Sequence, residues 1–132
     1  MTGLLVATDL DSCLLDETYS LEAAREALHA LREAEIPLVL ASSKTREEVE
    51  PLWRELGLEA PFIVENGGAL LFPEDPHLPW ARPSGGLFVL ELGVPRRELV
   101  AVLHAIAHEA GTRLAGFAAL GPAGIAAATG LS

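Results

Sequence analysis

Near its N-terminus the chain reads Leu4-Leu5-Val6-Ala7-Thr8-Asp9-Leu10-Asp11. The apolar run over residues 4–7 predicts a central β-strand that is buried on both faces. This strand ends at the first aspartate, so Asp9 and Asp11 lie in the loop that follows it. The same pattern, an apolar run closed by polar residues, occurs twice more along the chain. Together the three runs decide the fold.

Two further apolar runs, over residues 38–41 and 62–64, predict the second and third strands. After Ser20, apolar residues at helical spacing predict a helix between the first two strands. Thr45 and Glu48 form a capping-box pattern, which predicts a second helix before the third strand. Strands and helices that alternate in this way predict an α/β fold with a Rossmann-like parallel sheet.

The composition changes at Pro73, and the proline-rich segment 73–84 is interpreted as a linker. We therefore expect one domain over residues 1–84, including the linker, and a second, incomplete unit over residues 85–132. Hydrophobic spacing and turn residues in the second unit predict a strand over 87–92, a helix from Pro95 to Gly111, a strand over 114–117 and a short helix over 123–129.

The composition also excludes some classes of function. A formal net charge of −10 and a pI near 4.7 oppose binding to nucleic acid and to anionic membranes. The segment 114–131 carries no charge, but its proline, glycines and alanines indicate soluble structure instead of a membrane span. The single cysteine, Cys13, excludes an internal disulfide, and the N-terminus lacks a secretory signal pattern. We therefore expect a cytoplasmic protein.

Three polar clusters follow the three predicted strands: Asp9-Leu10-Asp11, Ser42-Ser43-Lys44-Thr45 and Glu65-Asn66-Gly67-Gly68. The carboxyl ends of parallel strands meet at one edge of a sheet, where ligands bind. One site there would collect carboxylates, hydroxyls, an ammonium group and backbone N–H groups. That set of groups suits phosphoryl transfer.

Asp9 and Asp11 are the candidate catalytic residues and the candidate ligands of Mg²⁺, a hard cation that takes oxygen ligands and usually retains waters. One carboxylate can attack phosphorus while the other transfers protons. The alternative is that both are ordinary turn and cap residues, as in most Asp-x-Asp pairs. Their position directly after an apolar strand favours the catalytic interpretation.

The stretch Thr8-Asp9-Leu10-Asp11-Ser12-Cys13-Leu14-Leu15-Asp16 resembles the first motif of haloacid dehalogenase-like phosphatases. The resemblance implies that Asp9 is the nucleophile, through an aspartyl-phosphate intermediate, and that Asp11 is the general acid/base. Ser42 matches the second motif, a hydroxyl that holds the transferring phosphoryl group. The chain would then be a Mg²⁺-dependent enzyme.

The match narrows with Ser42-Ser43-Lys44-Thr45-Arg46 and with Glu65-Asn66-Gly67-Gly68-Ala69, which resemble the mannosyl-3-phosphoglycerate phosphatase family. The resemblance implies a haloacid dehalogenase-like (HAD-like) core over 1–84 and the beginning of an α+β cap domain over 85–132. It also implies a glycosyl-3-phosphoglycerate substrate, with mannose or glucose, and release of a compatible solute such as mannosylglycerate.

The candidate phosphate-binding residues are Ser42, Ser43, Lys44, Asn66 and Gly67. Lys44 is the only lysine in a chain with eight arginines, so a compact ammonium group for a phosphate or carboxylate is favoured over a solvated surface residue. Asn66 either contacts substrate or stabilises its own turn, and the sequence does not separate the two roles.

Some features depart from the family pattern. Ser12 stands where glycine is common and Cys13 where threonine is common, and Cys13 is interpreted as a packing residue. No aspartate follows Asp75 and no lysine follows Lys44, so the family's later lysine and acidic motifs are absent. We therefore expect an N-terminal portion of a longer phosphatase, with an incomplete sheet that favours self-association.

One rival function remains at this point, and a second is excluded. A non-catalytic phosphate-binding or assembly module could keep the HAD fold, and it would bind ligand without Mg²⁺ and without turnover. A phosphorylatable receiver domain would need a paired acidic site, a separate phosphoacceptor strand and a late lysine, which this chain lacks.

Overall fold

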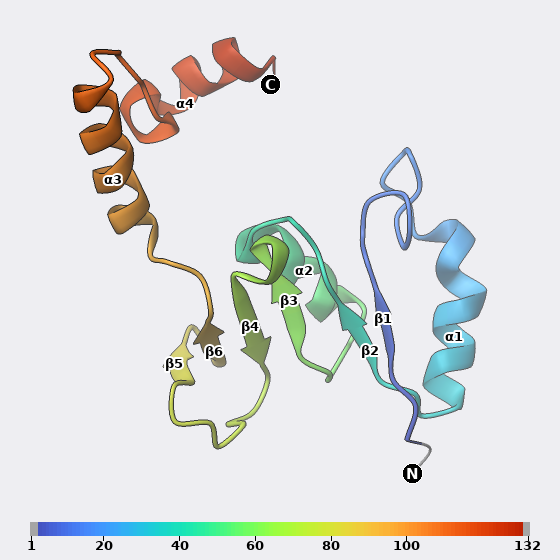
Figure 1. Cartoon of the computed structure of the whole chain (residues 1–132). Coiled ribbons are helices and arrows are strands. Elements are labelled where there is room, and N and C mark those ends of the chain that lie inside the picture. The colour runs from blue at the N-terminus through green and yellow to red at the C-terminus, as the bar shows by residue number, and fades with distance from the viewer. Residues whose placement is uncertain (1–2, 131–132) are drawn as a thin grey trace. The chain divides into compact units, whose positions relative to one another are not determined.

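The computed structural model describes residues 3–130, which divide after Gly93 into two compact units (Figure 1). Within the described residues, every strand lies in the first unit. They are β1 (Val6–Thr8), β2 (Leu38–Leu40), β3 (Phe62–Val64), β4 (Ala69–Phe72), β5 (Arg82–Ser84) and β6 (Leu87–Glu91).

The three apolar runs form the three strands that the sequence predicts. β1 and β2 pair in parallel, with Val6 opposite Leu38. A parallel bridge between Ala41 and Ile63 joins the end of β2 to β3. The carboxyl ends of these three strands therefore lie at the same edge.

Beyond β3 the pairing becomes antiparallel, in the order β3-β4-β6-β5. The chain reverses between β3 and β4 in a 3₁₀ turn over Glu65–Gly67, where φ is 55° at Asn66 and 89° at Gly67. A turn this short cannot make a crossover, so β4 returns antiparallel. The α/β class is confirmed, with a sheet that is parallel only through β3.

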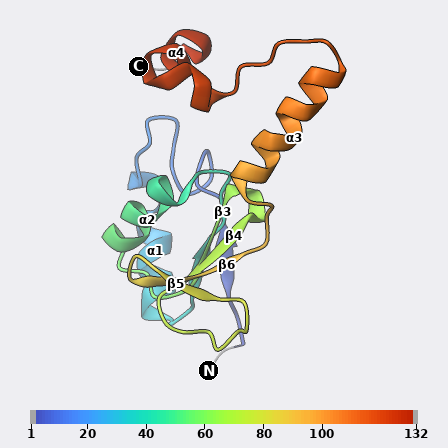
Figure 2. The same ribbon diagram turned by 90° about the vertical axis from the view of Figure 1, so that its left-hand side faces the viewer.

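Two helices pack on the parallel part: α1 (Arg25–Glu33), which follows a 3₁₀ turn over Glu22–Ala24, and α2 (Arg46–Glu55). Figure 2 shows both helices on the same side of the strands. The predicted capping box forms at the start of α2, where the Thr45 backbone N–H donates to Glu48 Oε2 at 2.9 Å.

The core lies between these helices and the strands. Leu40, Val49 and Phe62 are fully buried, and the Trp53 ring packs on Phe62 with 5.2 Å between ring centroids. Trp53 Nε1 donates to the carbonyl oxygen of Ala60 at 2.8 Å, so its one polar atom is satisfied. This core holds the loops at the carboxyl ends of β1–β3 in place.

The expectation that the first strand is buried on both faces is wrong. Leu4 and Leu5 are each 55% exposed, whereas every residue of β2 is buried. The reason is pairing, because among the described residues β1 has a neighbouring strand, β2, on one edge only. Self-association through such an edge stays a prediction.

The second unit contains two helices, α3 (Arg96–Glu109) and α4 (Phe117–Thr129). The helix predicted from Pro95 to Gly111 is confirmed. The strand predicted over 114–117 is wrong, because residues 114–116 are irregular and Phe117 begins α4, which bends where Gly121 has a φ of 65°. Within residues 3–130, no helix combines the length and the apolar character that crossing a bilayer requires.

The division after Gly93 differs from the boundary at 84/85 expected from the proline-rich segment. The difference arises because β6 pairs with β4 and because the N–H groups of Leu92 and Gly93 both donate to the Gly68 carbonyl oxygen. Strand pairing over long range therefore extends the first unit past the linker. The assignment of 85–132 to a cap domain stays a proposal.

Candidate active site

The loop after β1 is a tight turn anchored by buried leucines. The carboxylate of Asp9 accepts the Leu10 N–H at 2.7 Å, and its carbonyl oxygen accepts the Leu14 N–H at 3.3 Å. Leu10, Leu14 and Leu15 are buried in the core, so the backbone between them is held while Asp9 and Asp11 remain exposed. The turn thus exposes two carboxylates on a backbone that the buried leucines hold in place.

The clusters after β2 and β3 are tied to each other through Ser42. The N–H of Ser42 donates to the Ile63 carbonyl oxygen at 3.1 Å, and its own carbonyl oxygen accepts the Asn66 N–H at 3.1 Å. Its hydroxyl, on a residue only 5% exposed, accepts the Lys44 N–H at 3.2 Å. Ser42 therefore organises the loop backbone around it.

A depression of about 620 Å³ opens at this edge of the sheet. It brings together five of the seven site residues predicted from the sequence. They are Asp9, Ser42, Ser43, Asn66 and Gly67. The polar clusters of three strands thus share one cavity, as the position of the strand ends requires.

The remaining two predicted residues, Asp11 and Lys44, pair with each other instead of lining this depression. Lys44 Nζ lies 3.1 Å from Asp11 Oδ2, with side chains 19% and 44% exposed. The hydrogen bond that the Lys44 ammonium group donates to Asp11 raises the pKa of Lys44 above its ordinary value, so the ammonium form is held. Lys44 is therefore partly buried and partnered by a carboxylate, and its role toward phosphate stays a proposal.

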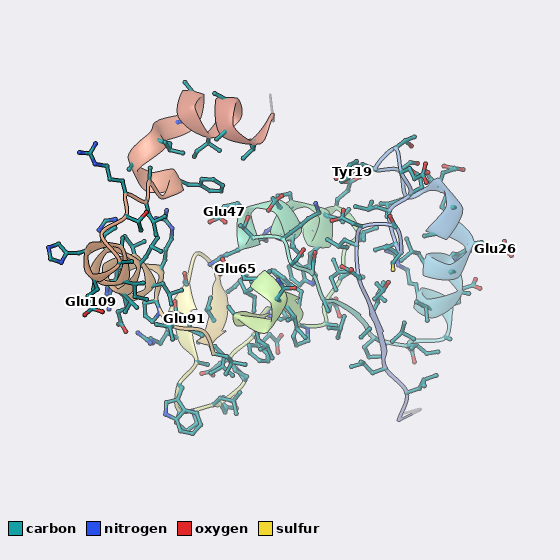
Figure 3. The ribbon with its side chains drawn as sticks, turned by 45° about the horizontal axis from the view of Figure 1, so that its top comes forward. Tyr19, Glu26, Glu47, Glu65, Glu91 and Glu109 are labelled. Carbon is teal, nitrogen blue, oxygen red and sulfur yellow. The ribbon has the colours of Figure 1, made fainter. Side chains whose placement is uncertain are left out.

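Tyr19, an aromatic residue that the sequence analysis did not single out, contacts the lysine of the pair of Asp11 and Lys44. The ring of Tyr19 lies beneath Lys44, with Nζ 5.2 Å from the ring centroid. Figure 3 shows Tyr19 on the loop between β1 and α1. No periodicity marks Tyr19, and only its place in a polar loop close to the first motif could have drawn attention to it.

Ser12 and Cys13 lie in the loop that carries Asp9 and Asp11. Ser12 has a φ of 59°, a left-handed conformation that glycine adopts without strain and serine does not. Cys13 is exposed, so its interpretation as a packing residue is wrong. The turn projects this side chain outward because the neighbouring leucines occupy the core.

Arg46 joins the site loop to the β5–β6 hairpin. Its guanidinium group donates to Ser84 Oγ and to the Ser84 carbonyl oxygen, both at 3.1 Å, and its Nε pairs with Glu50 at 2.6 Å. A Cβ atom at Gly85, where φ is 57°, would lie 2.9 Å from Arg46 Nη2. The positive φ favours glycine at this position, and a Cβ atom there would oblige the Arg46 guanidinium group to shift.

The donor set fits a partly hydrated Mg²⁺ ion. Asp9 uses Oδ1 for Leu10, and Asp11 uses Oδ2 for Lys44. Within the described residues, the other oxygen of each carboxylate has no protein partner. Two hard oxygen donors suit Mg²⁺, which is commonly bound by one or two carboxylates together with waters and substrate phosphate. Within residues 3–130, no group of three or more acidic, histidine or cysteine side chains is arranged so that it could hold a metal ion.

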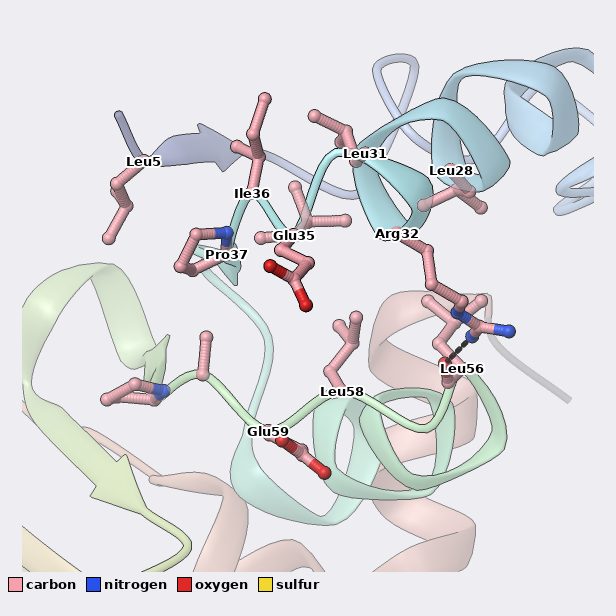
Figure 4. A pocket seen from close by; sticks show the side chains of 13 residues that line it. Leu5, Leu28, Leu31, Arg32, Glu35, Ile36, Pro37, Leu56, Leu58 and Glu59 are labelled. Atoms are coloured by element: carbon pink, nitrogen blue, oxygen red, sulfur yellow. Dashed lines mark hydrogen bonds between the residues drawn. The ribbon is translucent and has the colours of Figure 1, made fainter. Parts of the chain in front are cut away.

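A second cavity, also of about 620 Å³, lies at the opposite, amino ends of the same strands (Figure 4). Its lining is mainly apolar and includes Leu5, Leu28, Leu31 and Leu58. On one side Arg32 donates to the Leu56 carbonyl oxygen at 2.8 Å. It contains none of the predicted site residues, so we place the candidate chemistry in the first cavity.

Comparison with known protein families identifies the family of this chain. Residues 6–78, more than half of the chain, match the haloacid dehalogenase-like hydrolases. The chain belongs to this family. The matched region contains all seven predicted site residues, from Asp9 to Gly67.

Individual relatives of the chain carry more specific names than the family. The chain is 41% identical to a glucosyl-3-phosphoglycerate/mannosyl-3-phosphoglycerate phosphatase of Methanococcoides burtonii, over 96% of this chain and 48% of that protein. It is 36% identical to a mannosyl-3-phosphoglycerate phosphatase of Pyrococcus furiosus, over 85% of this chain and 47% of that protein. The chain thus spans about half the length of these curated relatives.

Solved structures agree with the fold. A hypothetical protein from Geobacillus kaustophilus HTA426 matches 82% of this chain and 37% of its own, with a TM-score of 0.58 and 27% identity. A haloacid dehalogenase-like hydrolase from Bacteroides thetaiotaomicron matches 80% of this chain and 37% of its own, with a TM-score of 0.58 and 25% identity. Both similarities support a haloacid dehalogenase-like core.

Proposed function

We propose that the chain provides the nucleophile side of a phosphomonoester hydrolase that acts on a glycosyl-3-phosphoglycerate, with mannose or glucose as the sugar. The observation that carries the proposal is the depression that gathers Asp9, Ser42, Ser43, Asn66 and Gly67 at the carboxyl ends of β1–β3. The names of the relatives supply the substrate class.

Asp9 is the proposed nucleophile. Its carboxylate oxygen bonds to phosphorus, the bond from phosphorus to the glycerate oxygen breaks, and an aspartyl-phosphate results. Asp11 protonates the departing glycerate oxygen and then takes a proton from the water that hydrolyses the aspartyl-phosphate. Phosphate leaves and the Asp9 carboxylate is restored.

The other polar groups hold the phosphoryl oxygens. Ser43 is exposed and carries a hydroxyl donor, and the side-chain amide of Asn66 and the backbone of Gly67 lie at the same cavity. Ser42 holds the loop and offers its hydroxyl proton, because its oxygen already accepts the Lys44 N–H. Lys44 shares its ammonium group between Asp11 and the phosphoryl oxygens.

Asp9 and Asp11 are the residues proposed to hold Mg²⁺. The bound cation supplies positive charge that screens the two carboxylates from each other and from the phosphoryl oxygens. The protein's part is to carry both carboxylates on one anchored turn, with Asp9 at the depression and Asp11 beside Lys44.

The test is phosphate release from mannosyl- and glucosyl-3-phosphoglycerate by the 132-residue chain with Mg²⁺. Asp9→Asn should lower the rate at least about 10³-fold, because the nucleophile is lost. Asp75→Asn is the matched control, since Asp75 is an exposed aspartate that caps the His77 N–H outside the site. A wild-type rate above the enzyme-free background that Asp9→Asn leaves unchanged would contradict the proposal.

The same experiment distinguishes a phosphatase from the non-catalytic alternative. A phosphate-binding or assembly module would bind either substrate without Mg²⁺ and release no phosphate. Binding measured by calorimetry, with and without Mg²⁺ and beside the release assay, decides between the two functions. A cytoplasmic location and self-association belong to the same proposal and are tested by fractionation and by sedimentation.

A further inference from the structure

The loop between β1 and α1 contains a short turn, residues 16–20, that several hydrogen bonds close although most of it is exposed. One carboxylate oxygen of Asp16 accepts the Thr18 N–H at 2.8 Å, the Thr18 hydroxyl at 2.7 Å and the Ser20 N–H at 3.0 Å. The Asp16 N–H donates to the Ser20 carbonyl oxygen at 3.0 Å, which closes the turn. These bonds, that from Ser20 first, lower the pKa of Asp16.

Tyr19 stands inside this closed turn in a strained conformation. Its φ is 60°, which is uncommon for a bulky side chain, and its N–H donates to the Asp16 carbonyl oxygen at 2.9 Å. Its side chain is 67% exposed, so no burial of the ring explains the strain. Such conformations persist only where surrounding bonds impose them, and they concentrate at functional sites.

The ring that this turn presents lies against the one lysine of the chain. Lys44 Nζ is 5.2 Å from the Tyr19 ring centroid and 3.1 Å from Asp11 Oδ2. The electron-rich ring face attracts the ammonium group on one side while the carboxylate attracts it on another. Two elements far apart in sequence, the Asp16–Ser20 turn and the loop after β2, thus meet at Lys44.

We infer that Tyr19 is a positioning residue, which holds the Lys44 ammonium group beside Asp11 at the site and so places it for the phosphoryl oxygens. The inference rests on the proposed function for the part that concerns phosphate. The placement of Lys44 itself rests only on the geometry of the turn and the ring.

Two variants separate the ring from the rest of the side chain. Tyr19→Phe keeps the ring and removes the hydroxyl. Tyr19→Asn removes the ring, and asparagine tolerates the left-handed conformation, so the turn keeps its backbone. Amide spectra of the buried residues of β2 confirm that each variant of the 132-residue chain is folded.

The first measurement uses selective isotope labelling of lysine, which reports on Lys44 alone because the chain has no other lysine. The ring face should shift the Lys44 side-chain methylene signals upfield in wild type and in Tyr19→Phe, and the shift should vanish in Tyr19→Asn. Identical Lys44 signals in wild type and Tyr19→Asn would overturn the inference.

The second measurement is the affinity for inorganic phosphate in the presence of Mg²⁺. Tyr19→Asn should bind about two- to fivefold more weakly than wild type, and Tyr19→Phe should match wild type. Equal affinity in wild type and Tyr19→Asn would overturn the role toward phosphate. If wild type binds no phosphate, the proposed function fails, while the Lys44 signals still decide the placement of the ammonium group.

Discussion

The two cavities of the first unit have the same volume, about 620 Å³, and opposite chemistry. At the carboxyl ends of β1–β3 the chain turns through short polar residues, and their backbone groups remain near the cavity. At the amino ends it enters β2 and β3 through Pro37 and Pro61, and leucines line the space. The same strands therefore build a polar site at one end and an apolar groove at the other.

This difference between the two cavities shows that the volume of a cavity does not identify the candidate active site; the side chains that line it do. Polar groups collect where parallel strands end, because the loops there converge. The apolar groove instead lies beside β1, which has a strand neighbour on one edge only in the described residues. Four changes, ordered by expected effect, would break or sharpen this contrast.

The largest effect is expected from Phe62→Ala. Phe62 is fully buried and lies between Pro61, which lines the apolar groove, and Ile63, which lines the polar depression. Loss of the ring should lower the free energy of unfolding by about 3–5 kcal/mol and damage both cavities. Urea denaturation measures it, and a loss below about 1 kcal/mol would show that the two cavities do not share this wall.

The second change tests helix α2, which runs from the polar depression to the apolar groove. Burial acts to raise the pKa of Glu50, but hydrogen bonds from Arg46 and Arg54 hold it below its ordinary value of 4.5. Since the folded-state pKa is lowered, the stabilisation is complete above pH 4.5 and is lost as the pH falls through the folded-state value.

Glu50→Gln should therefore lower the free energy of unfolding by about 1–2 kcal/mol at neutral pH, with the gap to wild type closing in acid. Denaturant midpoints across the pH range measure this. Glu55→Gln, an exposed change on the same helix, should follow the wild-type curve. A gap that persists unchanged in acid would contradict the role given to the Glu50 carboxylate.

The third change lies on the rim of the polar site. Ser12→Gly should raise the free energy of unfolding by about 0.5–1 kcal/mol, because φ is 59° there and glycine adopts it without strain. Ser43→Gly, at an exposed position without a positive φ, should lower it instead. Thermal denaturation of both variants gives the comparison, and equal signs would refute the backbone explanation.

The smallest effect is expected on the rim of the apolar groove. Leu5 is 55% exposed, so Leu5→Ala should lower the free energy of unfolding by less than about 1 kcal/mol. Urea denaturation beside Phe62→Ala gives the ratio of the two effects. A loss as large as that of Phe62→Ala would mean that Leu5 is buried in solution.

Much of the first unit was predictable because its signals are local. Apolar runs located β1, β2 and β3, and the Thr45 and Glu48 pattern located the start of α2. The burial of β1 was not predictable, because the same apolar run suits a central strand and an edge strand. Only the neighbours of a strand decide how much of it is exposed.

The candidate site divides in the same way. Residue types and strand ends predicted which side chains gather, and five of the seven line one depression. The sequence had no means of showing that Asp11 pairs with Lys44, or that the Tyr19 ring lies against the ammonium group. Those contacts depend on the path of loops between distant segments.

The sequence by itself determined the order of strands and helices, the two aspartates after β1 and the family to which they point. These follow from hydrophobic spacing and motif, which act over a few residues. The tertiary structure alone decided that β6 joins the first unit, that Ser42 links two loops and that Tyr19 reaches Lys44. Each is a contact between segments distant in sequence, and packing of the whole unit selects such contacts.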